Sequence, residues 1–148
     1  MKKANIIKII SICFMAISIA LMLLPSGVAM KFVSEPGPPM EYVTHYYSYI
    51  SGMPIGYGNW FPIVTAILSF AVLLVLIISI IRKTESESGS RKTVLILLSI
   101  CIVAALISWR LFNSVSIIGV IICVLHAIAL ALQIIFKRTE ERDVSPAL

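Results

Sequence analysis

Four long apolar runs constrain the fold more than any other feature of this 148-residue sequence. They cover Ile9–Leu24, Trp60–Ile81, Thr93–Trp109 and Val115–Phe136, and none contains a charged residue. At about 1.5 Å per residue, helices of this length approach or match a hydrocarbon core roughly 30 Å thick. Because a segment in lipid must satisfy its own backbone hydrogen bonds, each run is expected to be helical. A soluble core could bury one such run but not four.

The basic residues divide unevenly between the two sides of the predicted membrane. If all four runs cross it, only Lys31 and Arg110 fall on one side. The other ten fall on the opposite side: Lys2, Lys3, Lys8, Arg82, Lys83, Arg91, Lys92, Lys137, Arg138 and Arg142. Since basic residues are retained in the cytoplasm, both termini are predicted to be cytoplasmic. The net charge of +5 then reflects membrane anchoring, not nucleic-acid binding.

The predicted fold is an all-α, four-transmembrane-helix bundle that forms a single integral membrane domain. The helices are expected at residues 4–24, 60–81, 93–109 and 115–136. A long extracytoplasmic loop, residues 30–59, joins the first two helices, and a polar cytoplasmic loop, residues 82–92, joins the next two. Residues 137–148 are charged, contain Pro146, and are predicted to be a disordered tail.

The first segment also resembles a secretory signal peptide. Residues 1–29 have a basic start, an apolar middle and small residues at Gly27 and Ala29, after which cleavage is conceivable. However, the run extends to a full crossing if the Lys8 side chain reaches the headgroups. We favour an uncleaved first helix and leave cleavage open.

Three of the predicted helices carry small residues on one face, which is typical of helices that pack closely in lipid. The third helix gathers Cys101, Ala104, Ala105 and Ser108, and the first gathers Cys13, Ala16 and Ala20. In the fourth, one stripe holds Gly119, Cys123, His126, Leu130 and Gln133. We predict that these faces form the interior, with Gly119, Cys123, Ala104 and Ser108 as packing residues.

His126 and Gln133 form a candidate intramembrane polar site. His126 is the only ionisable side chain deep in an apolar run, and such residues are functional candidates. A proton relay needs a second titratable group, yet no run contains Asp or Glu. A neutral histidine bonded to a serine, to Gln133 or to a carbonyl is the structural alternative, and the sequence favours it.

The extracytoplasmic loop contains all five tyrosines of the chain, Tyr42, Tyr46, Tyr47, Tyr49 and Tyr57. An aromatic belt at the membrane surface would explain some of them. Because tyrosine loses little entropy on binding, a recognition surface for a protein, peptide or glycan is the other interpretation. The spacing of Tyr42, Tyr46 and Tyr49 suits an amphipathic helix, whereas alternation through Val43, His45 and Tyr47 suits a strand.

The chain resembles small four-span bacterial membrane proteins of no assigned function. The resemblance rests on Tyr47-Ser48-Tyr49, on Pro54-Ile55-Gly56-Tyr57-Gly58-Asn59 and on residues 62–65, about a fifth of the chain. It implies a bacterial cell membrane and no activity, so it carries no catalytic residue over. Small multidrug exporters, quinone-linked thiol oxidases and claudin-like proteins fit poorly, because the first run has no carboxylate, no C-x-x-C occurs and loop 31–58 has no cysteine.

We therefore expect a non-enzymatic membrane protein that associates with another membrane or envelope component, or with a second copy of itself. The Tyr-rich loop and the small-residue helix faces would make these contacts. The alternative is a small transporter or channel component acting as an oligomer, with His126 and Gln133 along its path. The sequence contains no constellation of nucleophile and base, no set of metal ligands and no cofactor motif, so an enzyme and a cofactor are not expected.

Overall fold

The computed structural model describes residues 3–35, 41–51, 58–81 and 87–144, and within them the chain forms four helices and two strands. The helices are α1 (Lys3–Met22), α2 (Phe61–Ile81), α3 (Glu87–Phe112) and α4 (Ile117–Val144). The strands, β1 (Val28–Glu35) and β2 (Glu41–Tyr47), follow α1 in the chain. The protein is thus mostly helical, as the apolar runs predict.

Three helical segments are long and apolar enough to cross a membrane, namely Phe61–Ile81, Gly89–Phe112 and Ile117–Ile135. The apolar part of α1, Ile6–Met22, is shorter. By length and composition, these helices indicate a membrane-spanning protein.

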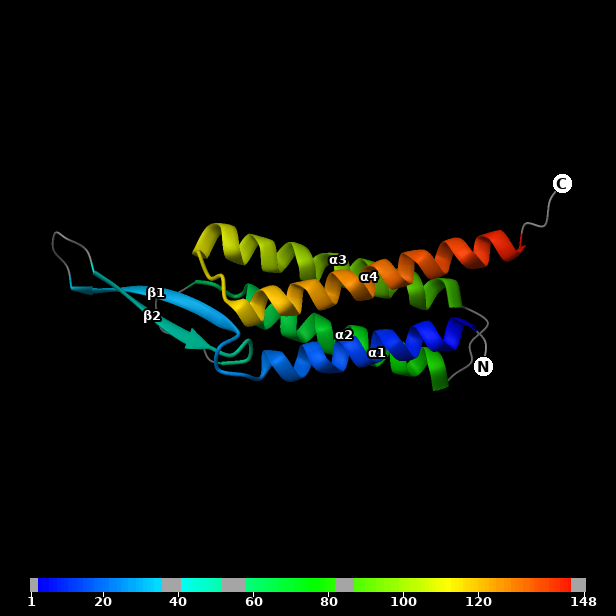
Figure 1. Ribbon diagram of the computed structural model, residues 1–148, viewed down its shortest axis with the longest axis horizontal. Helices are drawn as coiled ribbons and strands as arrows, with labels where there is room; N and C mark the ends of the chain where they lie inside the picture. Colours follow the sequence, from blue (N-terminus) through cyan, green and yellow to red (C-terminus); the bar gives the residue numbers. More distant parts are fainter. Residues whose placement is uncertain (1–2, 36–40, 52–57, 82–86, 145–148) are drawn as a thin grey trace.

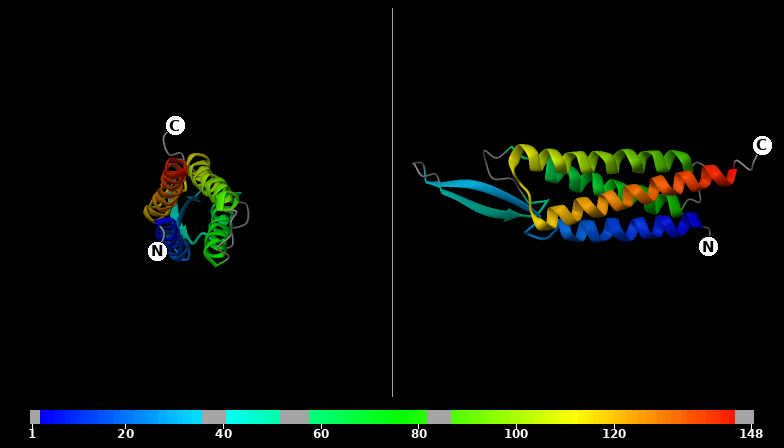
Figure 2. Two further views of the ribbon diagram at one scale, coloured as in Figure 1. Left: turned by 90° about the vertical axis from the view of Figure 1, so that its right-hand side faces the viewer. Right: turned by 45° about the horizontal axis from the view of Figure 1, so that its top comes forward.

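The helices form an up-and-down bundle (Figure 1). Each helix packs against the next one in the chain, and α4 closes the ring against α1. The hairpin lies between α1 and α2 in the sequence, but these two helices still pack together. The view along the bundle in Figure 2 shows this ring from its end. Both termini lie at one end, and the strand pair extends from the other (Figure 1).

The strand pair is an antiparallel hairpin whose register pairs Val28 with Tyr47 and Val33 with Tyr42. The sequence alone left this segment open between a helix and a strand. The structure selects the alternating pattern, because Val28, Met30 and Tyr47 then face the end of the bundle together. The hairpin adds a small sheet to a fold that the sequence predicts to be entirely helical.

Two helices are longer than the sequence predicts. α3 begins at Glu87, inside the predicted cytoplasmic loop, and α4 continues to Val144, inside the predicted disordered tail. Hydropathy marks which residues suit hydrocarbon, but helical hydrogen bonding does not stop where the charged residues begin. The predicted helix boundaries at 93 and 136 therefore mark the apolar segments and not the helix ends.

Two apolar clusters form the core. The first, near the termini, contains Met15, Val72, Leu76, Val94, Leu98 and Ala129. The second, near the hairpin, contains Met22, Val28, Met30, Tyr49, Ala66 and Ile122. We call them the terminal cluster and the hairpin cluster.

The predicted inner face of the first helix is wrong. Cys13, Ala16 and Ala20 are exposed, and α1 instead turns Ser11, Met15, Ser18 and Met22 inward. The polar serines find partners on α4, which a rule based only on small residues does not consider. The small-residue face of α3 is buried, as predicted.

Candidate functional site

The hairpin has two faces with different surroundings. Val28, Met30 and Tyr47 lie on one face and pack into or against the hairpin cluster. Farther out on that face, the rings of Phe32 and His45 meet edge to face with centroids 5.5 Å apart. This face fixes the hairpin to the bundle.

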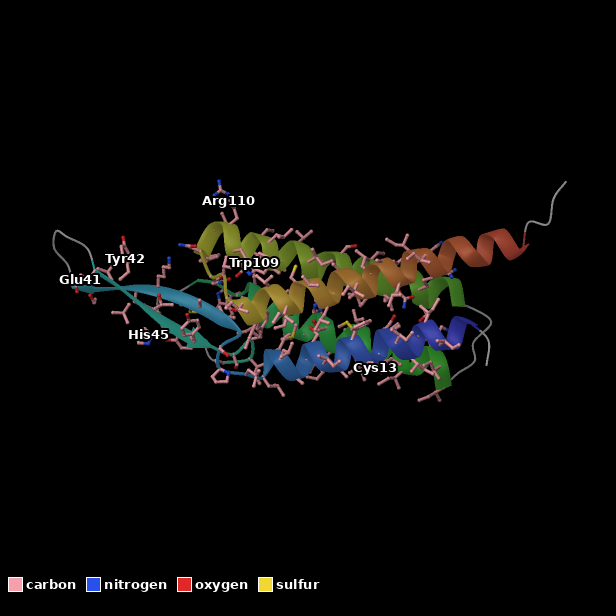
Figure 3. All side chains as sticks on the ribbon, in the orientation of Figure 1. Cys13, Glu41, Tyr42, His45, Trp109 and Arg110 are labelled. Atoms are coloured by element: carbon pink, nitrogen blue, oxygen red, sulfur yellow. The ribbon has the colours of Figure 1, made fainter. Side chains whose placement is uncertain are left out.

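The opposite face carries two exposed tyrosines. Tyr42 is 61% exposed and pairs across the strands with Val33, itself 49% exposed. Tyr46 is 58% exposed, and between these positions the exposed Lys31 pairs with Thr44. Figure 3 shows Tyr42 and His45 projecting from opposite sides of the hairpin. We call Lys31, Val33, Tyr42, Thr44 and Tyr46 the tyrosine face.

The five tyrosines predicted as one interaction surface do not share one environment. Tyr42 and Tyr46 belong to the tyrosine face, whereas Tyr47 is half-buried against the hairpin cluster and Tyr49 is 4% exposed. Tyr57 lies outside the described residues. Because Tyr49 is buried, it is not part of the predicted interaction surface and instead packs in the hairpin cluster.

Tyr49 seals the junction between the hairpin and the helices. Its backbone N–H donates to the Met22 carbonyl at 3.0 Å, and its ring lies against Gly27, where an added Cβ would be 2.9 Å from Tyr49 Cδ2. Burial raises the pKa of the Tyr49 hydroxyl above its ordinary value, with a smaller contribution from Cys123. The Ser116 hydroxyl donates to the Gly27 carbonyl and accepts from the Gly119 N–H.

His126 lies at the centre of the bundle, with 1% of its side chain exposed. Its Nε2 is 2.8 Å from Ser69 Oγ on α2, and its Nδ1 is 2.7 Å from the Ile122 carbonyl oxygen. Ser18 Oγ on α1 is 3.4 Å from Nδ1. Cys101 Sγ on α3 is 3.9 Å from Ser69 Oγ. This central cluster therefore joins all four helices.

In its neutral form, His126 has one tautomer that fits these contacts. A carbonyl oxygen only accepts, so Nδ1 carries the proton donated to Ile122. Nε2 is then an acceptor, and the Ser69 hydroxyl donates to it. The Thr65 carbonyl, 2.7 Å from Ser69 Oγ, competes for the same hydroxyl proton. Both ring nitrogens thus have partners without any acidic group, one within α4 and the other on α2.

Ser69 and His126 are as close as a catalytic nucleophile and its general base, but a substrate cannot reach them. Ser69 is 0% exposed and His126 1% exposed, so no substrate reaches Ser69 Oγ in this conformation. Among the described residues, no group of three or more His, Cys, Asp or Glu side chains could hold a metal ion. The central cluster has the geometry of a packing element.

Gln133, the other predicted intramembrane polar residue, lies at a different level and does not contact His126. Its Nε2 donates to Ser11 Oγ at 3.0 Å, joining α4 to α1. Of the predicted packing residues, Gly119, Ala104 and Ser108 are buried and Cys123 is half-buried. The structure thus separates His126 and Gln133 into two helix contacts.

A third polar cluster lies near the hairpin end, and sequence reasoning missed its central residue. Asn59, 0% exposed, donates through Nδ2 to Ser108 Oγ at 2.9 Å and to Ser114 Oγ at 3.4 Å. Ser108 and Ser114 are 2.7 Å apart. The cluster ties the residues just before α2 to the last part of α3, through Ser108, and to the link that follows it, through Ser114. An asparagine directly before an apolar run is the signal that could have identified it.

No protein-family model, curated protein or solved structure matches this chain.

The polar clusters alternate with apolar ones along the bundle. From the hairpin end, the order is Asn59 with its serines, the hairpin cluster, His126 with its partners, the terminal cluster, and Ser11 with Gln133. Among the described residues, no buried side-chain nitrogen or oxygen lacks a hydrogen-bond partner. Such an interior holds helices in register and contains no continuous polar path along these clusters.

Proposed function

We propose that this protein is a non-enzymatic integral membrane protein that binds an extended segment of another envelope protein through the tyrosine face of its hairpin. The exposure of Tyr42 and Tyr46 on a sheet that projects beyond the helices is the observation that carries the proposal. The protein would act as a membrane anchor for that partner.

The membrane placement in this proposal has four spans with both termini in the cytoplasm. α1 supports a fourth span because it packs alongside α2 and α4. The charge distribution supports the orientation, since Lys31 on the hairpin and Arg110 near the end of α3 lie at the hairpin end (Figure 3). The hairpin then stands on the extracytoplasmic side.

The hairpin suits an extended partner for two physical reasons. Within the described residues neither β1 nor β2 has a second strand neighbour, so each leaves backbone groups on its outer edge for a further strand. The tyrosine face adds rigid aromatic area beside those edges, with little entropy lost on binding. An isolated pair of strands is also only marginally stable in water, so an added strand would stabilise it.

Transport through the bundle is the weaker alternative. The apolar clusters on both sides of His126 argue against a conducting path, and the neutral tautomer needs no proton acceptor beyond Ile122. A solute-flux assay in liposomes separates the two functions, because a binding protein alone should conduct nothing.

Site-specific photocrosslinking in cells tests the proposed surface. A photoreactive residue at position 42 or 46 should crosslink to a partner protein, while one at position 45, on the opposite face of the same strand, should crosslink much less. The variant Tyr42→Ser with Tyr46→Ser should lose the adduct formed from a probe at position 44. Tyr47 and Tyr49 are left intact because they pack against the bundle.

Equal crosslinking from positions 42 and 45 would contradict a face-specific contact. An adduct that is unchanged in the double serine variant would mean that the two tyrosines do not bind the partner and form only an aromatic belt at the membrane surface. An adduct with the mass of two copies of the chain would show that the hairpin contacts a second copy of this protein and not an envelope partner.

A further inference from the structure

A small polar pocket opens at the end of the bundle opposite the hairpin. All four helices line it, with Lys8 from α1, Ser79 from α2, Ser90 and Arg91 from α3, and Gln133 from α4. Leu76 and Val94, both members of the terminal cluster, complete its wall. The pocket therefore sits directly on the apolar core and is bordered by polar groups.

Two cations from separate helices converge on this pocket. Lys8 is only 8% exposed although it is charged, and Arg91 is half-buried. Burying a cation is costly unless its charge is compensated by partners. Both side chains also interact with other groups of the protein, so an anion would join or compete with those contacts.

We propose that this pocket binds a phosphate group, presented by an anionic lipid headgroup or by free phosphate. The planar Arg91 guanidinium can donate two parallel hydrogen bonds to phosphate oxygens, and Lys8 adds a compact positive charge. Ser90 brings a hydroxyl donor to the same opening, whereas the Ser79 hydroxyl already donates to the Leu76 carbonyl. Gln133 donates one amide proton to Ser11 and has a second.

The level of the pocket favours the lipid source. Ser90 and Arg91 lie at the start of the span-length segment Gly89–Phe112, and Ser79 lies near the end of Phe61–Ile81. On the proposed membrane placement this level is that of the cytoplasmic headgroups, where basic pockets between helices bind anionic lipids. Because the enclosed part of the pocket is small, only the phosphate would enter, with the acyl chains outside the bundle.

Thermal unfolding of the full-length protein in non-ionic detergent tests this site. Phosphatidic acid in the micelles should raise the unfolding midpoint in a concentration-dependent way, and phosphatidylcholine should not. Arg91→Gln should weaken the apparent affinity about tenfold, the effect of one charge-assisted hydrogen bond. Lys92→Gln is the matched control, because it removes the same charge from the exposed neighbouring residue, which does not line the pocket, and should keep the wild-type affinity.

A parallel titration with inorganic phosphate at constant ionic strength distinguishes the sources. A midpoint shift with both ligands, lost in Arg91→Gln, identifies a general phosphate site, whereas a shift with the lipid alone identifies a headgroup site. The proposal is overturned if neither ligand shifts the midpoint, or if Lys92→Gln loses as much affinity as Arg91→Gln. Lys8→Gln adds a second variant, and lipid retained in native mass spectrometry gives a readout that does not depend on the unfolding midpoint. Crosslinking from the hairpin should be unchanged in Arg91→Gln, so this site and the proposed function fail separately.

Discussion

His126 shows how one buried polar side chain can organise a membrane bundle. It connects α4 to the diagonally placed α2 through Ser69 and approaches α1 through Ser18. Hydrogen bonds between helices in lipid contribute modestly one at a time, on the order of 1 kcal/mol. Their direction is more important for fixing the register of the helices, because a shifted helix would leave a buried donor or acceptor without a partner.

His126→Ala should lower the free energy of unfolding by about 1–3 kcal/mol, because Ser69 loses its imidazole partner and a cavity forms. Unfolding in mixed detergent micelles measures this loss. His45→Ala is the matched control, since His45 is exposed on the hairpin and its removal should change stability far less. Liposomes containing His126→Asn should show the same proton flux as wild type, and a lower flux would revive a proton-carrying role.

Tyr49 makes the stability of the protein sensitive to high pH. Burial raises its pKa in the folded state above the unfolded value of about 10. Below that value the hydroxyl is neutral in both states, and its full contribution to stability is present. As the pH rises above about 10, the unfolded state loses the proton first, so stability falls.

Tyr49→Phe should therefore reduce the loss of stability between neutral pH and pH values above about 10, measured as the change in unfolding midpoint. Tyr42→Phe controls for the removal of one phenol at an exposed position and should retain the wild-type decline. Identical pH profiles for wild type and Tyr49→Phe would mean that the buried hydroxyl is not responsible.

At the scale of elements, the start of α4 packs unusually close to the segment after α1. A Cβ built on Gly119 would lie 3.0 Å from Ser116 Oγ and 3.1 Å from the Gly27 carbonyl oxygen. The second neighbour is backbone and cannot rotate away. Glycine at this position is therefore explained by the close approach of the two segments.

Gly119→Leu should disrupt this contact and cost at least about 1–3 kcal/mol, as overpacking of a close contact does. Size-exclusion profiles and thermal unfolding in detergent check the result. Ala127→Leu is the matched control, because Ala127 is exposed on the same helix and an added side chain there meets no packed neighbour. Wild-type stability of Gly119→Leu would count against the observed packing of α4.

At the scale of the whole molecule, the two ends of the bundle differ in character. One end carries the hairpin with its tyrosine face, and the other carries both termini and the pocket of Lys8 and Arg91. In the proposed orientation a partner protein is met outside and a phosphate group inside. Between the two ends, the alternating polar and apolar clusters hold the four helices in register.

Cysteine labelling tests the orientation. In a variant with Cys13, Cys101 and Cys123 replaced by serine or alanine, a single cysteine at position 44 should react with an impermeant maleimide in intact cells. A single cysteine at position 92 should react only after the membrane is opened. Labelling of position 92 but not 44 in intact cells would reverse the topology. Labelling of both positions would place them on the same side and exclude the single span proposed between them.

The positions of the four helices, though not all of their ends, follow from the apolar runs, because the need to satisfy backbone hydrogen bonds in lipid is a local requirement. The sequence also predicted that Gly119, Ala104, Ser108 and His126 face inward, since those residues follow a helical stripe. It could not select the inner face of α1, because Ser11 and Ser18 are buried by partners on α4 that lie more than a hundred residues away.

The conformation of the loop and the burial of its tyrosines depend on contacts between distant segments. Residues 41–47 fit a helix and a strand equally well by spacing, and pairing with Val28–Glu35 against the end of the bundle selects the strand. That register exposes Tyr42 and Tyr46, while Tyr49, just after β2, is buried against Gly27. The pocket of Lys8, Arg91 and Gln133 likewise depends on three helices that meet only in the folded bundle. The apolar helices form from local chemistry, because lipid requires each to satisfy its own backbone hydrogen bonds. The hairpin, the buried clusters and the pocket form only where distant segments meet.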